Sequence, residues 1–530
     1  KITLPNSIAI TDKKDLLQRL KEKQYTNAPS FSLLERYDYH KIQDQASNAI
    51  SRVQTFILDK LMDDTHYTYD ANGNISSILQ NGKSIAQYQY DEANQLIEER
   101  QDHFKIHYTY DSQGNLLTKI KTNLLTNEET EVHHYTYSLS TFGKQLTDFD
   151  NQNLTYDDYG LLLQWNQQNL TYNYQHQMTQ FGTHTFQYDT FGCRTFKNQI
   201  EYTYDDQGRL LKEVNGTHTI LYFYDGLSIC SIQVDGQLYF LRRNLFQDVT
   251  HIYDLSGNLV ASYLYDAWGN HQVFDASGAL NTNADFIGNI NPIRYRGYYF
   301  DVETNLFYCN SRYYSSELCR FLIPDSIEYL EPESINGLNL YAYCGNDPIN
   351  KYDPTGHFVI SLTILGLIIG TAIGATAGGI ASYNIAKNNG AEGWELFGWT
   401  MAGIVGGGVI GGALGAGVGA LVTKATGVIG LSITKYSIIP IKGTTVLGHM
   451  SGYIGAAQAT GSGYYLVSNG TYAKMVQKGV EWTNNMTYLK DANSLGSRFV
   501  LAPDFVVREG GTFWKEIQYL IENGIPWEMF

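Results

Sequence analysis

Cysteine and positive charge are both scarce in this chain of 530 residues. None of the cysteines has the paired short spacing of a zinc site, so we expect no metal centre. The number of cysteines is odd and their density low, so no disulfide framework is implied, and free buried thiols are expected for most of them. The formal net charge of −16 argues against broad binding to a phosphate backbone, although a small nucleic-acid-directed domain at one end stays possible. The five cysteines are Cys193, Cys230, Cys309, Cys319 and Cys344.

A recognisable signal peptide is also missing, and the first residue is Lys1 rather than methionine. These features favour a piece of a longer precursor. The length is too great for one hydrophobic core, so we expect about two or three domains.

Tyrosine, in contrast, is abundant, with 42 residues against 23 phenylalanines. Many of the tyrosines belong to a returning phrase, Tyr-x-Tyr-Asp-x-x-Gly followed by a polar and an apolar residue. Clear copies occupy residues 67–75, 108–116 and 202–210, and looser copies begin near Tyr88, Tyr135, Tyr172, Tyr222 and Tyr263. A spacing of about twenty residues predicts a stacked array in which each unit buries its apolar face on the next.

Each copy of the phrase predicts a strand, a tight turn and a second strand. The Tyr-x-Tyr alternation suits a strand with two different faces, while aspartate and glycine supply the turn. These repeats dominate residues 64–275. Upstream, we expect a mixed segment at 1–63, with helices over residues 12–23 and 46–61.

A denser block follows at residues 292–357. It contains Arg-Tyr-Arg-Gly at 294–297, Arg-Phe-Leu-Ile-Pro-Asp at 320–325 and Asp-Pro-Thr-Gly-His at 353–357. This block resembles the core of the RHS/YD-repeat family, which includes wall-associated bacterial proteins, toxin-complex C proteins and animal teneurins. The resemblance covers roughly residues 64–357. It implies a β-sheet spiral that is wound into a hollow cocoon. The core block ends this cocoon, and in bacterial members a variable toxin follows the core block.

The composition changes abruptly after residue 357. Residues 358–386 and 396–423 carry no charge, and each stretch is long enough to span a bilayer as a helix. Their glycines recur every fourth residue, which places them on one helix face. A glycine-rich helical hairpin at 358–435 is therefore expected, either buried in the shell or inserted into a target membrane. Both interpretations hold if the hairpin is first stored in the shell and later inserted into the membrane.

The remaining segment, 436–530, predicts a small α/β toxin domain. We expect strands at 443–448, at 464–467, at 499–502 as a central parallel strand, and from Ile525. Helices are expected at 453–459, 482–495 and 515–521. The whole chain is thus predicted to be multidomain, with a β-rich YD-repeat shell at 64–291, the core block at 292–357, the helical hairpin and the α/β domain.

The order of these elements resembles the nucleoside deoxyribosyltransferase and TIR-like group, whose members cleave N-glycosidic bonds, including that of NAD. The resemblance implies that Glu516 is the catalytic carboxylate, with His449 and Asp504 as further catalytic candidates. A solvated helix residue remains the alternative for Glu516, as does a turn residue for His449. The residues expected to bind substrate are Gly448, Gly511, Thr512, Trp514 and Tyr519.

The boundary at 353–357 is a second candidate site. RHS proteins of Gram-negative type cut themselves after Asp-Pro-x-Gly-Leu with aspartates as an acid/base pair, and Asp353 and Asp325 match such positions. His357 departs from the family's leucine, which puts cleavage in doubt. The alternative for Asp353-Pro354 is a simple turn.

The resemblance implies a secreted or cell-surface toxin of interbacterial competition whose C-terminal domain reaches the target cytoplasm. NAD or a related nucleotide would be its substrate, with no cofactor. Expected partners are an immunity protein, the target membrane through residues 358–423, and secretion components or a chaperone, with no stable nucleic-acid partner. The alternatives are a nuclease toxin, which the near charge balance of 436–530 disfavours, an ADP-ribosyltransferase toxin and a non-enzymatic adhesion protein.

Overall fold

The computed structural model describes residues 2–361 except 5–6, 17–18, 28–29, 43–44, 139–143, 191, 206–207, 227, 327–338 and 358, together with residues 444–447, 498–501 and 527–529. The chain divides into two compact units. The first unit contains residues 1–372 and 390–398, and the second contains residues 373–389 and 399–530.

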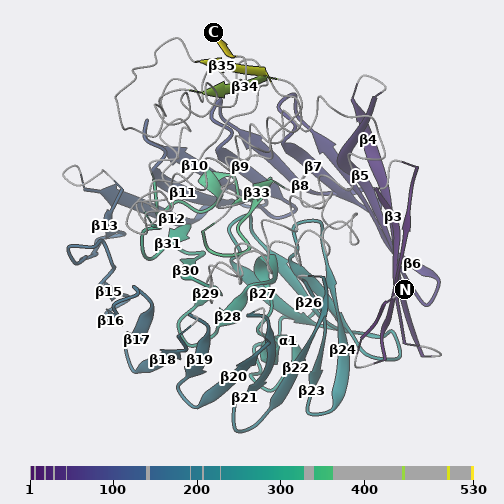
Figure 1. The fold of residues 1–530 in the computed structure, drawn as a ribbon. Coiled ribbons are helices and arrows are strands. Elements are labelled where there is room, and N and C mark those ends of the chain that lie inside the picture. Colours follow the sequence, from purple (N-terminus) through teal and green to yellow (C-terminus); the bar gives the residue numbers. More distant parts are fainter. Residues whose placement is uncertain are drawn as a thin grey trace. The chain divides into compact units, whose positions relative to one another are not determined.

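Two long antiparallel sheets form most of the described part of the first unit (Figure 1). In both sheets every strand pairs with the next one along the chain. The first has 14 described strands: β1 (Ile2–Thr3), β2 (Ala9–Lys14), β3 (Leu20–Asn27), β4 (Phe31–Ile42), β5 (Gln45–Ile57), β6 (Lys60–Tyr69), β7 (Ile75–Gln80), β8 (Lys83–Tyr90), β9 (Leu96–Gln101), β10 (Phe104–Tyr110), β11 (Leu116–Asn123), β12 (Glu129–Tyr137), β13 (Leu146–Phe149) and β14 (Gln152–Asn153).

The second sheet continues the same up-and-down order. Its 13 described strands are β15 (Gln164–Trp165), β16 (Gln168–Tyr172), β17 (Met178–Phe181), β18 (His184–Tyr188), β19 (Arg194–Lys197), β20 (Ile200–Tyr204), β21 (Leu210–Val214), β22 (Thr219–Asp225), β23 (Ser228–Val234), β24 (Gln237–Arg243), β25 (Val249–Tyr253), β26 (Leu259–Tyr265) and β27 (His271–Asp275). The β-rich shell architecture predicted from the repeats is therefore confirmed.

The aspartate of the repeated phrase closes each turn. Asp70 Oδ1 accepts the backbone N–H groups of Asn72 at 2.9 Å and Asn74 at 2.8 Å, and Asn74 Nδ2 donates to Asp70 Oδ2 at 3.1 Å. Gly73 adopts a φ of 87°, which explains why glycine stands at this place in the phrase. Asp111 makes the same set of bonds in its own turn.

The second tyrosine of the phrase connects neighbouring repeats. Its hydroxyl donates to the backbone carbonyl at the start of the strand that follows the previous turn. Tyr90 reaches Ile75 O at 2.8 Å, and Tyr110 reaches Leu96 O at 2.8 Å. Each repeat is thus fastened to the one before it, as expected for a stacked array.

The helix predicted over residues 12–23 is wrong, because this segment is the β2–β3 hairpin. Arg19 N and Nε donate to the two Asp15 carboxylate oxygens at 3.0 and 2.7 Å, which is the arrangement of Asp205 and Arg209 in a recognised repeat. The turn at Asp15 and Arg19 lacks the glycine and the asparagine of the phrase, so the charged residues around it match the polar face of a helix in the sequence.

The helix predicted over residues 46–61 is also wrong, since β5 and β6 occupy this range. Val53, Thr55 and Ile57 all point into the core with at most 8% exposure. The polar Thr55 interrupts the apolar alternation that would have predicted a strand. The strand array consequently reaches back to residue 2 rather than beginning near residue 64.

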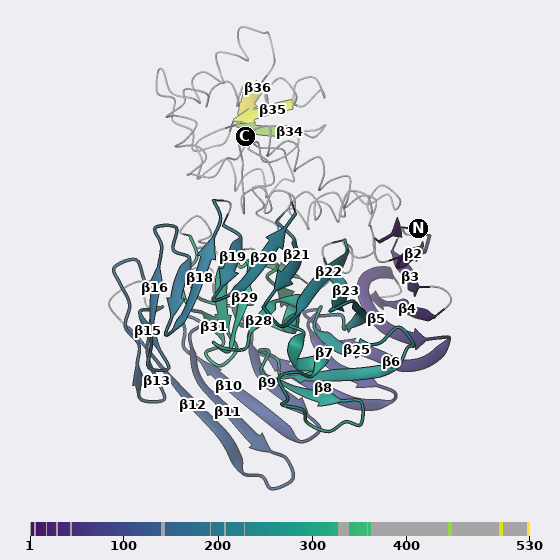
Figure 2. The ribbon, with the colours of Figure 1, turned by 90° about the horizontal axis from the view of Figure 1, so that it is seen from below.

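The core block lies between the two long sheets (Figure 2). Its side chains bind the turns of both: Asn346 Nδ2 donates to Gly114 O at 2.6 Å, and Tyr314 hydroxyl donates to Trp268 O at 2.7 Å. Its described elements are α1 (Ile287–Ile290), the 3-10 turn η1 (Tyr295–Gly297), the antiparallel sheet β28 (Tyr299–Asp301), β29 (Leu306–Cys309), β30 (Arg312–Ser315) and β31 (Arg320–Phe321), the 3-10 turn η3 (Cys344–Asn346), and the pair β32 (Lys351–Tyr352) and β33 (Ile360–Ser361).

The described part of the second unit contains three short parallel strands: β34 (Thr444–Leu447), β35 (Arg498–Leu501) and β36 (Trp527–Met529), with β35 in the middle. They match three of the predicted strands. The predicted strand at 464–467 and all predicted helices of 436–530 lie outside the described residues, so the α/β class remains a prediction.

The glycine-rich hairpin at 358–435 also lies outside the described residues, apart from the short β33. Among the residues that the structure describes, no helix has the length and apolarity needed to cross a bilayer.

Candidate functional site

The predicted boundary at 353–357 is a loop between two paired strands. β32 and β33 pair antiparallel, so the chain reverses its direction between these two strands. The loop faces the tight connection between β29 and β30, where Asn310 adopts a φ of 66°.

Four side chains hold the backbone of this loop, carbonyl by carbonyl. Tyr298 hydroxyl donates to the carbonyl of residue 353 at 2.6 Å. Asn310 Nδ2 donates to that of residue 354 at 3.1 Å, and Ser311 Oγ to that of residue 355 at 2.7 Å. Arg312 Nε donates to that of residue 356. We call this arrangement the carbonyl clamp; because it binds backbone atoms, it fixes the path of the loop.

Aspartate and glycine are needed inside the clamp for separate reasons. Asp353 Oδ1 accepts the backbone N–H groups of Gly356 at 2.8 Å and Thr355 at 3.2 Å. Gly356 has a φ of +80°, and a Cβ there would approach Cys309 O to 2.6 Å. The Asp-Pro-x-Gly sequence is therefore the sequence that this loop geometry requires.

The three residues predicted for self-cleavage are brought together at the clamp. Arg312 Nη2 lies 2.7 Å from Asp325 Oδ2 and 3.7 Å from Asp353 Oδ2. His357 Nδ1 donates to Asp325 Oδ1 at 2.6 Å. A pair of carboxylates beside a peptide segment is chemically suited to general acid/base work, and here one guanidinium compensates their charge.

Sequence reasoning missed Arg312 as the centre of this site. The side chains of Arg312, Asp325 and Asp353 are only 5, 6 and 1% exposed. Two buried carboxylates require a buried cation, which is the signal that would have pointed to an arginine of the core block.

All five cysteines are free and buried, as predicted. Cys309 lies beside the clamp, where burial, and then the charge of Asp353, raise the pKa of its thiol well above the ordinary value. Such a thiol stays protonated and is a poor nucleophile, so it adds no chemistry to the site.

The predicted residues of the C-terminal domain lie outside the described residues. They are Glu516, His449, Asp504, Gly448, Gly511, Thr512, Trp514 and Tyr519.

The repeats agree with what known proteins show. Residues 99–280 match the family model of the teneurin YD-shell. The chain is 35% identical over 180 residues to the tRNA3(Ser)-specific nuclease WapA of Bacillus spizizenii. The aligned region covers 29% of this chain and 7% of that protein. It is 40% identical over 81 residues to the toxin protein Tse5 of Pseudomonas aeruginosa, which covers 15% of this chain and 6% of that protein.

Residues 99–280 therefore form a YD-shell of the kind found in the RHS/YD-repeat family. The chain spans only 7% of the length of the WapA relative and 6% of that of Tse5.

Solved structures agree on the fold. The crystal structure of TcdB2-TccC3-Cdc42 is 17% identical with a TM-score of 0.50, covering 69% of this chain and 21% of that chain. The structure of TcdB2-TccC3 without its hypervariable C-terminal region is 18% identical with a TM-score of 0.50, covering 66% and 20%.

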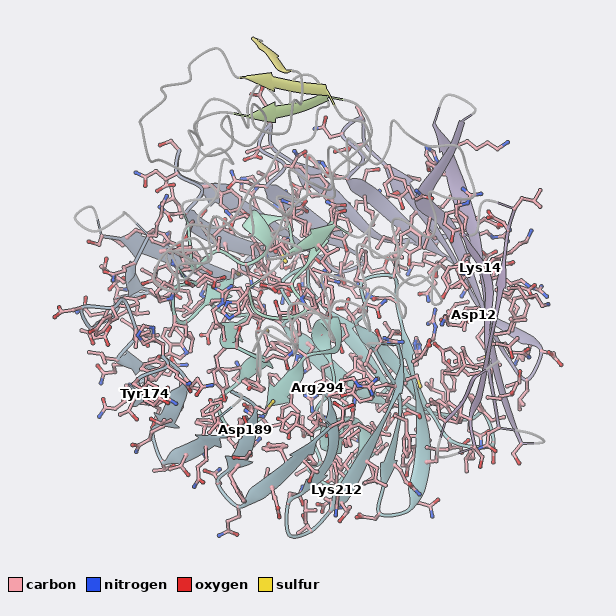
Figure 3. All side chains as sticks on the ribbon, in the orientation of Figure 1. Asp12, Lys14, Tyr174, Asp189, Lys212 and Arg294 are labelled. Atoms are coloured by element: carbon pink, nitrogen blue, oxygen red, sulfur yellow. The ribbon has the colours of Figure 1, made fainter. Side chains whose placement is uncertain are left out.

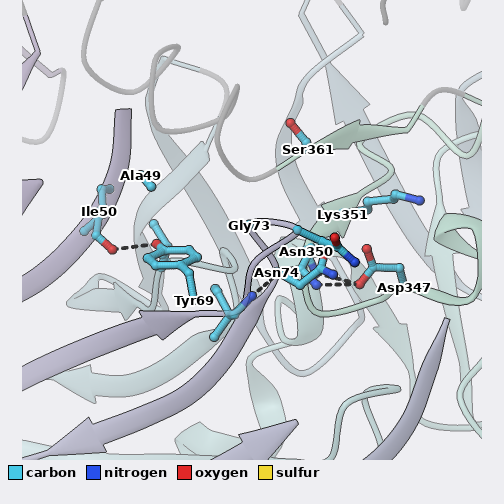
Figure 4. Close-up of a pocket in the computed structure, with 12 residues that line it drawn as sticks. Ala49, Ile50, Tyr69, Gly73, Asn74, Asp347, Asn350, Lys351 and Ser361 are labelled. Atoms are coloured by element: carbon cyan, nitrogen blue, oxygen red, sulfur yellow. Dashed lines mark hydrogen bonds between the residues drawn. The ribbon is translucent and has the colours of Figure 1, made fainter. Parts of the chain in front are cut away.

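The YD shell also contains a pocket of about 190 Å³ between a repeat turn and the core block (Figure 4). Asp347 Oδ1 accepts from Asn350 N and Nδ2 at 3.2 and 2.8 Å, and Asn350 Oδ1 accepts the N–H of Ile75 at 2.7 Å. Burial raises the pKa of Asp347. These polar groups join the core block to the turn near Gly73, so the pocket is a structural joint rather than a second reaction centre.

Proposed function

We propose that this chain is part of a polymorphic toxin of interbacterial competition, in which the YD shell stores a toxic domain. The carbonyl clamp carries the proposal: it ends the shell at residues 353–357, where the composition changes from tyrosine-rich strands to uncharged glycine-rich sequence. Two relatives, a tRNA nuclease and a toxin protein, support a toxin at this position.

The toxic domain at 436–530 is proposed to hydrolyse an N-glycosidic bond of NAD or a related nucleotide. β34 and β35 are parallel neighbours that end at Leu447 and Leu501. Ligands of such sheets bind beyond the carboxyl ends of the strands. His449 and Asp504 follow these two strand ends closely in the sequence, which supports one cleft containing both, with Glu516 as the catalytic carboxylate.

A nuclease is the second candidate activity for this domain, because the WapA relative carries that name. An immunity protein, secretion components or a chaperone, and the target membrane through residues 358–423 are the proposed partners. Secretion or surface display, followed by delivery to a target cytoplasm, is the proposed route.

The two activities are distinguished by producing the full chain in bacteria and measuring NAD content and tRNA integrity together. We expect NAD to fall while tRNA stays intact, and Glu516→Gln to restore NAD. Glu522→Gln is the matched control, since it removes the same charge from the same part of the sequence, and it should stay toxic. Intact NAD with cleaved tRNA would establish the nuclease instead.

Self-cleavage after His357 is proposed as a second activity of the shell itself. The convergence of Asp325 and Asp353 on Arg312 supports it. Incubated full chain should yield a shell fragment ending at 357 in intact-mass spectra, and Asp325→Asn should prevent this. A single intact mass after long incubation would contradict cleavage.

A further inference from the structure

The junction between the second sheet and the core block is held by a histidine and an arginine. His271 begins β27, and Arg294 lies between α1 and η1. Arg294 Nη1 and His271 Nε2 are 2.7 Å apart, and Arg294 is 3% exposed. Figure 3 places Arg294 in the part of the shell near the last strands of the second sheet.

The contact determines the protonation of the imidazole. A guanidinium has only donors, so His271 Nε2 must be the acceptor. The ring proton then resides on Nδ1, which donates to Gly269 O at 3.2 Å. Both nitrogens are satisfied only while His271 is neutral.

No carboxylate compensates this pair in the part of the chain that the structure describes. Arg294 Nε and Nη2 donate to the backbone carbonyls of Asn291 and Asn289 at 3.1 and 3.0 Å. The charge of Asp266 acts on His271 more weakly than that of Arg294. Asp266 Oδ2 already accepts from Asn270 Nδ2 at 2.7 Å and lies 3.4 Å from Lys119 Nζ.

The other groups packed against His271 are uncharged rings. Phe300 of β28 meets it edge-on at 4.6 Å, and Phe307 of β29 lies at 5.9 Å. Tyr265 of β26 lies at 5.7 Å, and burial raises its pKa well above the ordinary value, so it stays neutral. A proton on His271 would therefore meet the Arg294 cation without a counter-charge.

We propose that His271 is an acid sensor of the shell: on protonation it repels Arg294 and opens the junction between β27 and the core block. The inference goes beyond the proposed toxin activity and does not depend on what the C-terminal domain does. It gives the shell a means of loosening in an acidic compartment.

The pH window follows from the direction of the pKa shift. Burial, and then the charge of Arg294, lower the pKa of His271 to about 3 from 6.5. The open form binds the proton more readily, so the stabilisation is complete above pH 6.5 and is lost as the pH falls from 6.5 towards 3. The opening equilibrium should rise up to about tenfold per pH unit in this window, or roughly thirtyfold between pH 7.5 and 5.0.

Hydrogen exchange of the full chain at pH 7.5 and 5.0 tests the proposal. After correction for intrinsic exchange rates, peptides covering residues 263–300 should open roughly thirtyfold more at pH 5.0. His271→Gln, which keeps an acceptor but cannot take up a proton, should abolish this change. His107→Gln, at an exposed position on β10, should leave the change intact.

Arg294→Gln provides a second variant, because removing the cation removes the repulsion. It should weaken the pH dependence in these peptides, while the part caused by the burial of His271 should remain. His251 is a second buried histidine, and burial and the charge of Arg242 lower its pKa to about 4. Its effect on hydrogen exchange is measured in separate peptides, those that cover β25. Equal opening of 263–300 at both pH values in the wild type, or an unchanged pH dependence in His271→Gln, would overturn the proposal.

Discussion

Asp301 offers the sharpest test of how the core block is joined to the repeats. On β28 it accepts from Arg194 Nη1 at 2.5 Å and Lys197 Nζ at 2.9 Å, both on β19. The side chains of Asp301, Arg194 and Lys197 are 0, 1 and 4% exposed. Burial alone would raise the pKa of Asp301, but the charges of the two cations hold it below its ordinary value.

Asp301→Asn removes the negative charge and leaves two cations buried. Breaking a buried pair in this way costs about 3–5 kcal/mol. Glu303 lies 2.9 Å from Lys197 Nζ and retains part of the compensation, so we expect the lower end of that range. In a unit of this size the melting temperature should fall by about 4 °C.

The assay is thermal unfolding of the full chain at neutral pH. Asp275→Asn is the matched control, because Asp275 is only half-buried and its turn bonds can be made by an asparagine oxygen; it should melt like the wild type. Adding Arg194→Met to Asp301→Asn should recover much of the loss, since it removes one uncompensated cation. A melting temperature for Asp301→Asn equal to that of the wild type would refute this reasoning.

Three further predictions concern the clamp, a buried acid and the repeats. Gly356→Ala should loosen residues 353–357 and accelerate proteolysis there, since its positive φ and the approach to the Cys309 carbonyl exclude a Cβ; unchanged proteolysis would contradict the clamp. Burial, and then the charge of Asp266, raise the pKa of Glu99 to about 7 from 4.5. The free energy of unfolding should therefore fall by about 3 kcal/mol as the pH rises from below 4.5 to 7, because the folded state holds the proton more tightly. Glu99→Gln should remove this pH dependence of the free energy of unfolding, measured with a denaturant. Tyr110→Phe should cost about 1 kcal/mol in the same experiment, because it removes the bond to the previous repeat, whereas Tyr159→Phe, at a 72% exposed position, should cost nothing measurable.

The repeat array could be predicted because each of its turns is determined by a few neighbouring residues of the sequence. Asp70 and Gly73 act within five residues, so the phrase contains the whole turn. The hairpin at Asp15 and Arg19 makes the same bonds without the glycine, and the prediction failed there. Thr55 shows a second limit of the prediction. A buried polar residue interrupts the alternation of apolar residues from which a strand is predicted.

The candidate site was predicted in part. Asp325, Asp353 and His357 came from the resemblance to RHS proteins, and the structure places them together. Arg312 was missed because its role depends on contacts across 13 and 41 residues of sequence, which no local pattern encodes. The carbonyl clamp was missed for the same reason, since its side chains bind backbone atoms and leave no complementary sequence signal.

The shell that ends at the clamp is proposed to carry a toxic domain beyond it. The most direct measurement is the growth of bacteria producing the full chain against bacteria producing the same chain stopped after Ser361. The full chain should arrest growth, and the stopped chain, which retains the clamp and the β32–β33 pair, should not. Unimpaired growth with the full chain, or equal arrest by both chains, would contradict it.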